Sequence, residues 1–207
     1  MKVHLLIIFL YLILTGCTVT NGTQNETVNK AINLQQTIIN DPLFEKILTE
    51  LETSGQIDWS EGRTDYIREK LTSYKSNTDW LLSEYKNKGG FNKDSVFLWR
   101  KFNPLSSTTA VTSQCIEKTK LNKWNLNRNE YSILNTLIHE RVHSFCQVHP
   151  KGKQTREANK CDASYVAGDL AEILISHRMG IKEKVMDKPI CPALLQKIEE
   201  YKLIIIK

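Results

Sequence analysis

Three of the five histidines of the chain lie in one short segment, IHERVHSFCQVHP, at residues 138–150. If this segment is a helix, His139 and His143 are four residues apart and lie on the same face, so both imidazoles can bind one metal ion. Glu140 lies about 100° around the helix from His139. It is therefore placed to take a proton from a water molecule at that metal, and not to bind the ion itself. The spacing predicts a metal site with an adjacent general base.

The residues around this motif have the pattern of an amphipathic helix. Its apolar positions are Leu134, Leu137, Ile138, Val142 and Phe145. We predict a helix over residues 128–147, with Asn127 as the N-cap and Glu130 completing a capping box. Such a helix would hold both imidazoles on a rigid element.

Two short strands are predicted before the motif helix. SVFLWRKF (95–102) and STTAVTSQCI (107–116) are rich in β-branched and aromatic residues and are separated by Asn103-Pro104. Elsewhere, apolar residues recur at helical spacing, and we expect helices over 31–54 with a restart at Asp41-Pro42, over 64–88, over 159–179 and over 193–205. The fold class is therefore α+β, mostly helical with a small sheet preceding the motif helix, in a single domain over residues 31–207.

The first residues, MKVHLLIIFLYLILTGC, have the pattern of an export signal. Lys2 is followed by an apolar run from Leu5 to Leu14, which is too short to span a bilayer and has the length of a signal-peptide core. Residues 18–30, TVTNGTQNETVNK, are polar and nearly free of large apolar side chains, which predicts a flexible tether. We expect residues 1–17 to be removed.

The signal ends in Leu14-Thr15-Gly16-Cys17, which resembles the lipobox of bacterial lipoproteins. The resemblance implies that Cys17 is lipidated, becomes the first residue of the mature chain and anchors it at a membrane. Thr18, in place of aspartate, follows this cysteine. In enterobacteria that would favour the outer membrane, facing the periplasm or the exterior. We therefore expect a lipid-anchored protein of the bacterial cell envelope.

Charge and cysteine content limit the remaining possibilities. The formal net charge is +5, and the basic residues are spread along the chain without a basic helix. This is compatible with weak attraction to an anionic envelope and does not indicate nucleic-acid binding. With Cys17 assigned to lipid, the remaining cysteines are Cys115, Cys146, Cys161 and Cys191. In an exported protein this even number favours two disulfides, for which three pairings are open.

The motif His139 to His143 resembles that of the zincin metallopeptidases. In zincins an HExxH helix packs under a sheet and substrate binds along the edge of that sheet. The resemblance implies Zn²⁺ as cofactor, hydrolysis of protein or peptide amide bonds, and Glu140 as general base and later proton donor. The resemblance does not extend to residues 18–90.

Two histidines need a third ligand, and Asp162 is the favoured candidate. Asp162 and Tyr165 resemble the Asp-x-x-Tyr element of the aspzincins, which implies Asp162 as ligand and Tyr165 as hydrogen-bond donor to the oxyanion. If Cys146 pairs with Cys161, Asp162 would be held beside the histidines, because Cys146 lies three residues after His143 on the metal-facing side of a continuing helix. That pairing would leave Cys115 and Cys191 for the second disulfide.

Two other third ligands remain open. His149 lies six residues after His143, a spacing that resembles the metzincin pattern HExxHxxGxxH, with residues 185–187 as a possible Met-turn. However, Cys146 stands where that pattern has a glycine, which ends the helix in a conformation unfavourable for other residues. Asp169 and Glu172 on the following predicted helix are the last candidates, either as ligands or as carboxylates that orient the histidines.

Taken together, the residues predict a membrane-anchored, zinc-dependent metallopeptidase, with zinc on His139, His143 and Asp162. Proteins or peptides are the expected substrates, and peptidoglycan amide bonds remain an open alternative. A different class of function also remains open, namely a non-catalytic envelope lipoprotein with a structural metal or a partner-binding role. Replacement of Glu140 distinguishes the two classes, because hydrolysis needs this carboxylate and a structural metal does not.

Overall fold

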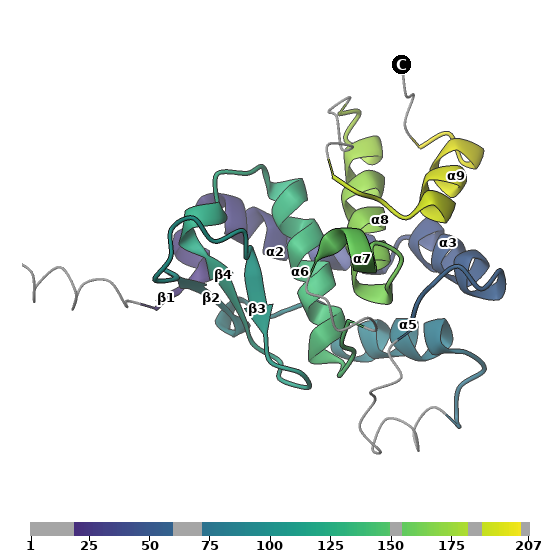
Figure 1. Ribbon diagram of the computed structural model, residues 1–207, viewed down its shortest axis with the longest axis horizontal. Helices are drawn as coiled ribbons and strands as arrows, with labels where there is room; N and C mark the ends of the chain where they lie inside the picture. The colour runs from purple at the N-terminus through teal and green to yellow at the C-terminus, as the bar shows by residue number, and fades with distance from the viewer. Residues whose placement is uncertain (1–18, 60–71, 150–154, 182–187, 204–207) are drawn as a thin grey trace, which may run out of the picture.

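Helices make up most of the structure, a computed structural model that describes residues 19–59, 72–149, 155–181 and 188–203 (Figure 1). Within these residues the α-helices are α2 (Glu26–Ile39), α3 (Pro42–Thr53), α5 (Asn77–Lys88), α6 (Glu130–Ser144), α7 (Arg156–Asn159), α8 (Ala163–Arg178) and α9 (Pro192–Glu200). No helix among them is long and apolar enough to cross a membrane. The predicted α+β class, mostly helical with a small sheet, is confirmed.

A four-stranded sheet lies beside α6. Its strands are β1 (Thr20–Asn21), β2 (Val96–Trp99), β3 (Ala110–Thr112) and β4 (Thr119–Asn122), in the order β1-β2-β4-β3. β2 and β4 run parallel, whereas β1 with β2 and β3 with β4 are antiparallel. β3 is therefore an edge strand, and Figure 1 shows it between the rest of the sheet and α6. β2 and β3 lie inside the predicted strands, whereas β1 and β4 were not predicted.

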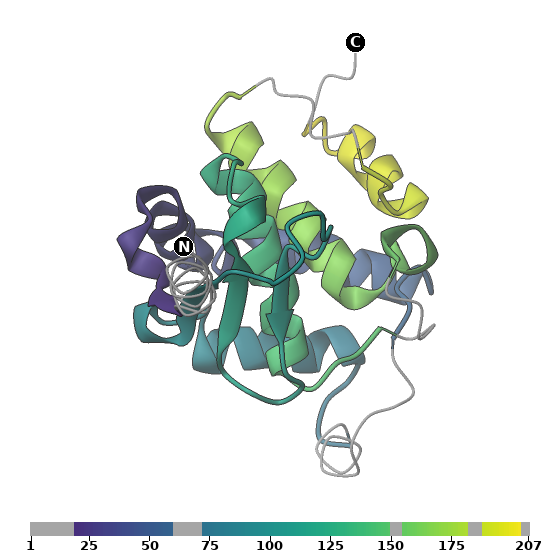
Figure 2. The same cartoon turned by 60° about the vertical axis from the view of Figure 1, so that its left-hand side comes forward.

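The core forms where α6 packs between the sheet and α8. The apolar side chains of α6, from Ile133 to Val142, are fully buried, and the hydroxyl of Tyr85 in α5 donates a hydrogen bond to the carbonyl of Ile138 (2.9 Å). Gly168 lets α8 approach α6 closely, because a Cβ at this position would lie 2.8 Å from the carbonyl oxygen of Asn135. In the turned view of Figure 2 the sheet stands in front of α6, and α9 lies away from the sheet. α6, which carries His139 and His143, is thus packed against the sheet, α5 and α8.

The N-terminal part of the domain differs from the predicted tether over residues 18–30. Residues 20–30 contain β1, a 3₁₀ turn and the beginning of α2. The polar residues that suggest a tether are helix caps: the side chain of Asn21 accepts a hydrogen bond from the amide of Thr23 (2.8 Å) and that of Asn25 from the amide of Val28 (3.0 Å). Val28 is fully buried. The signal peptide and Cys17 lie outside the described residues.

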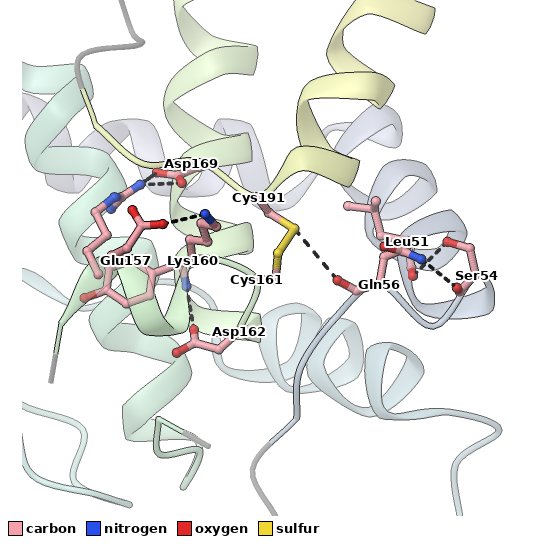
Figure 3. Close-up of a disulfide and its surroundings, with 11 residues drawn as sticks. Leu51, Ser54, Gln56, Glu157, Lys160, Cys161, Asp162, Asp169 and Cys191 are labelled. Atoms are coloured by element: carbon pink, nitrogen blue, oxygen red, sulfur yellow. Dashed lines mark hydrogen bonds and ion pairs between the residues drawn. A yellow bond between two sulfur atoms is a disulfide. The ribbon is translucent and has the colours of Figure 1, made fainter. Parts of the chain in front are cut away.

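Both disulfides differ from the predicted pairing, which was wrong. Cys115 pairs with Cys146, and Cys161 pairs with Cys191. The prediction assumed that the motif helix continues through Cys146, but α6 ends at Ser144, so helical periodicity does not apply to Cys146. In Figure 3 the Cys161–Cys191 bridge lies beside Gln56, and Asp162 points away from it. This bridge ties the beginning of α8 to the beginning of α9.

Candidate metal centre

Three histidines converge on one point at the end of α6. His139, His143 and His149 can each offer a ring nitrogen, and these nitrogens lie within 4.8 Å of one another. The Nε2 atoms of His139 and His143 are 3.1 Å apart. Within the described residues, this is the one group of three potential metal ligands at such distances. The three histidines could hold a metal ion.

A left-handed turn brings His149 back to the other two histidines. Cys146 follows the end of α6 with a φ of 73°, and the amides of Cys146 and Gln147 donate to the carbonyls of His143 (2.9 Å) and Val142 (3.3 Å). This is the hydrogen-bond pattern of a Schellman helix end, in which glycine is the common residue. Cys146 thus adopts the left-handed conformation that the metzincin pattern assigns to a glycine. Its disulfide partner, Cys115, also has a positive φ, of 64°.

Acceptors at Nδ1 orient the rings of two histidines. Nδ1 of His143 lies 2.8 Å from the carbonyl oxygen of Gln147, and Nδ1 of His149 lies 2.6 Å from Oδ2 of Asp162. Because a carbonyl and a carboxylate are acceptors, both Nδ1 atoms donate, and Nε2 is the nitrogen of each ring that remains for a metal. The rings are therefore held in the tautomer that a metal requires.

Asp162 lies next to the histidine group as the partner of His149. The carboxylate is only 2% exposed. Oδ2 accepts the hydrogen bond from His149, while Oδ1 accepts from the amide of Tyr165 (2.9 Å) and the hydroxyl of Ser164 (2.6 Å). Asp162 is thus also the N-cap of α8. The sequence placed Asp162 at the metal as a ligand, whereas both of its oxygens have other partners here.

Glu140 is buried beside the three histidines. It is 6% exposed, and its Oε2 has no hydrogen-bond partner among the described residues. Burial raises the pKa of Glu140 to about 7, although interaction with Thr112 of β3 opposes the shift. A carboxyl group with a pKa near neutrality can both accept and return a proton.

Burial also favours the neutral form of His139 and His143. Burial and the neighbouring His143 and His149 lower the pKa of His139 well below its ordinary value of 6.5. The pKa of His143 is lowered by burial as well, with the carbonyl of Gln147 acting in the opposite direction. Neutral imidazole is the form that binds metals.

Tyr165 packs against the histidine group. Its ring is stacked on that of His149, with centroids 5.3 Å apart, and meets the ring of His139 edge to face at 4.4 Å. The guanidinium of Arg156 lies 4.8 Å from the centre of the same ring. Burial and the nearby carboxylate of Asp162 raise the pKa of Tyr165, so its hydroxyl remains a hydrogen-bond donor at neutral pH.

Asp169 and Glu172 belong to a polar network with Asn135, Arg156 and Lys188. The side-chain amide of Asn135 donates a hydrogen bond to each of the two carboxylates, at 2.8 Å in both cases. Arg156 and Lys188 form ion pairs with Asp169, and Lys188 also pairs with Glu172. These two carboxylates therefore bind cationic side chains of the protein and are not part of the histidine group.

An open cleft of about 730 Å³ lies in front of this site. Residues 107–112, which include β3, line it together with α6, and His139, Glu140, His143, His149 and Tyr165 all contribute to its surface. The edge strand and the histidine group thus face the same space. The segment 185–187, suggested as a Met-turn, lies outside the described residues.

Comparison of the chain with protein-family models, with curated proteins and with solved structures finds no match. Sequence reasoning ranked His149 below Asp162 because Cys146 replaced an expected glycine. The spacing of His149 from His143 was the signal that pointed to the arrangement in the structure.

Proposed function

We propose that the protein is a zinc-dependent peptidase of the bacterial cell envelope, with His139, His143 and His149 as metal ligands. The observation that carries the proposal is the convergence of three imidazoles beside the buried carboxylate of Glu140 in an open cleft. Catalytic zinc sites use three protein ligands and keep a fourth position open, whereas structural sites are closed by four ligands. Among the described residues the group has three members, which favours the hydrolase over the structural-metal alternative.

The donor set fits zinc. Two nitrogens bound to one tetrahedral zinc at about 2.0–2.1 Å lie roughly 3.3 Å apart, and the Nε2 atoms of His139 and His143 are 3.1 Å apart. Each of two rings is oriented by an acceptor at Nδ1, as is usual for zinc-bound histidines. When bound, zinc would lower the pKa of a coordinated water to about 7 and polarise a carbonyl group.

The residues of the chain would supply the remaining chemistry. Glu140 would accept a proton from the attacking water and deliver it to the leaving nitrogen, a role supported by its pKa of about 7. Tyr165 would donate a hydrogen bond to the developing oxyanion from its place beside His139 and His149. A peptide could add to the edge of β3, whose backbone groups border the cleft.

The arrangement resembles the metzincin pattern more than the aspzincin pattern. The proposed ligands have the metzincin spacing, and Cys146 adopts the left-handed conformation of the glycine in that pattern. Asp162 would orient the ring of His149 through the hydrogen bond that it accepts from Nδ1. Lipidation of Cys17 and location at the outer membrane remain part of the proposal, on the strength of the lipobox at residues 14–17.

Removal and return of the metal tests this function. The purified mature chain is incubated with a peptide library, and cleavage is followed by mass spectrometry. We expect cleavage that stops after treatment with a chelator and returns on addition of zinc, because the three histidines would hold the ion reversibly. Absence of cleavage in the zinc-loaded protein, or cleavage unaffected by chelation, would contradict the proposal.

A further inference from the structure

The loop between β2 and β3, residues 100–109, exposes two large apolar side chains. Phe102 is 102% exposed and Leu105 is 91% exposed, more than any other large apolar residue among those described. Neither residue lines the cleft. Apolar side chains gathered at one exposed place are typical of a surface that contacts a partner or a membrane.

This loop is held in a defined conformation by hydrogen bonds. The indole of Trp124 donates to the carbonyl of Lys101 (2.9 Å). The side-chain amide of Asn125 donates to the backbone carbonyls of Ser106 (3.0 Å) and Thr108 (2.8 Å). Within the loop, the amide of Ser106 donates to the carbonyl of Asn103 (3.2 Å). These hydrogen bonds fix the backbone of the loop, from which the side chains of Phe102 and Leu105 extend into solvent.

Basic residues lie in and beside this loop. Arg100 and Lys101 belong to the loop, and Lys123 directly precedes Trp124 in the sequence. Arg100 stacks over the ring of Trp124, with 4.8 Å between the guanidinium and the ring centre, and Trp124 is itself partly exposed. Basic residues together with Trp, Phe and Leu are the composition of surfaces that bind anionic bilayers.

The strand register places the N-terminal end of the domain beside this loop. β1 is antiparallel to β2, with Thr20 opposite Leu98, so the chain that precedes Thr20 enters the sheet at the end from which Arg100 leaves it. Figure 1 shows β1 at the left end of the sheet. Cys17 is three residues from Thr20, a reach of about 10 Å. Lipidation of Cys17 belongs to the proposed function, and Cys17 itself lies outside the described residues.

We propose that Phe102 and Leu105, with Arg100, Lys101 and Trp124, form a membrane-docking surface for an anionic lipid bilayer. The two apolar side chains insert at the boundary between headgroups and acyl chains, and the basic residues contact anionic headgroups. The exposure and charge of the loop support this surface independently of Cys17. Because Ser107 and Thr108 of the same loop line the cleft, docking would hold the cleft close to the membrane.

Vesicle binding of the mature chain with Cys17→Ser tests this surface without a lipid anchor. We expect cosedimentation with vesicles that contain phosphatidylglycerol, weaker binding to vesicles of phosphatidylcholine alone, and a loss of binding at high salt. The Phe102→Ser/Leu105→Ser double variant should bind at least about tenfold more weakly. Met179→Ser, which replaces an exposed apolar residue at the end of α8, is the matched control and should bind as the parent does.

Several outcomes would overturn the docking surface. It fails if the parent chain does not bind anionic vesicles, or if the double variant binds them as tightly as the parent while circular dichroism shows both folded. It also fails if the double variant raises KM for a soluble peptide without vesicles and leaves vesicle binding unchanged, because the loop would then belong to substrate binding. Vesicle binding needs no hydrolysis, so its failure is distinct from failure of the peptidase proposal.

Discussion

Replacing Glu140 with glutamine is expected to lower turnover at least about 10²-fold while the metal content stays unchanged. The amide has almost the same shape as the carboxyl group but cannot accept the proton. Because Glu140 is buried next to His139 and its Oε2 has no partner among the described residues, the substitution removes proton transfer and leaves the three imidazoles in place. The measurement is kcat/KM on a cleaved peptide, with zinc per chain measured on the same sample.

The matched control for this prediction is Glu45→Gln. Glu45 forms an ion pair with Lys86 on the surface and does not line the cleft, so its substitution should leave both readings unchanged. Full turnover in Glu140→Gln would contradict the role of general base. Normal zinc content combined with no turnover in the parent chain would instead favour the structural-metal alternative.

The second large effect is expected from Asp162→Asn, which should weaken zinc binding about 10- to 100-fold. Asparagine is as good an N-cap as aspartate, so its carbonyl oxygen can still accept the hydrogen bond from Tyr165 and keep α8 in place. The negative charge of the Asp162 carboxylate beside Nδ1 of His149 is lost, and with it much of the orientation and basicity of that ring. Competition with a chromophoric chelator measures the affinity.

A second buried aspartate serves as the control for Asp162→Asn. Asp41 caps α3 through the amide of Leu43 (2.9 Å) and forms an ion pair with Arg178, away from the cleft. We expect Asp41→Asn to leave the zinc affinity unchanged. Complete loss of zinc from Asp162→Asn, together with full zinc in a variant that lacks the imidazole of His149, would identify Asp162 as the third ligand and contradict the geometry described above.

Local patterns in the sequence predicted most of the helices, but the helix expected over 64–88 was too long, because residues 72–76 are not helical and α5 begins at Asn77, with Ser76 as its N-cap. The restart at Asp41-Pro42 is where α2 gives way to α3, since Asp41 is the cap and Pro42 the first residue of α3. α6 was predicted with its apolar face and a capping asparagine, although the cap is Asn129 and not Asn127. β1 was missed because it has only two residues, and β4 was missed because its sequence, TKLN, has a single large apolar residue.

The third member of the histidine group depends on the tertiary structure. Whether His149 or Asp162 lies closer to His143 is decided by the turn at Cys146, and a positive φ at a residue other than glycine is not evident from sequence. The disulfide pairing depended on the same turn, so one error in the length of the helix produced both differences. Asn25 shows a related limit, because the same polar residue is common in tethers and in helix caps.

Zinc content of the parent chain and of His149→Ala tests the central claim most directly. We predict one zinc per chain in the parent protein under non-chelating conditions and loss of stoichiometric zinc in His149→Ala, because two imidazoles remain at a site built from three. His177→Ala, which removes an exposed histidine of α8, should keep one zinc per chain. A parent protein without zinc, or a His149→Ala variant that binds zinc as tightly as the parent, would contradict the three-histidine site.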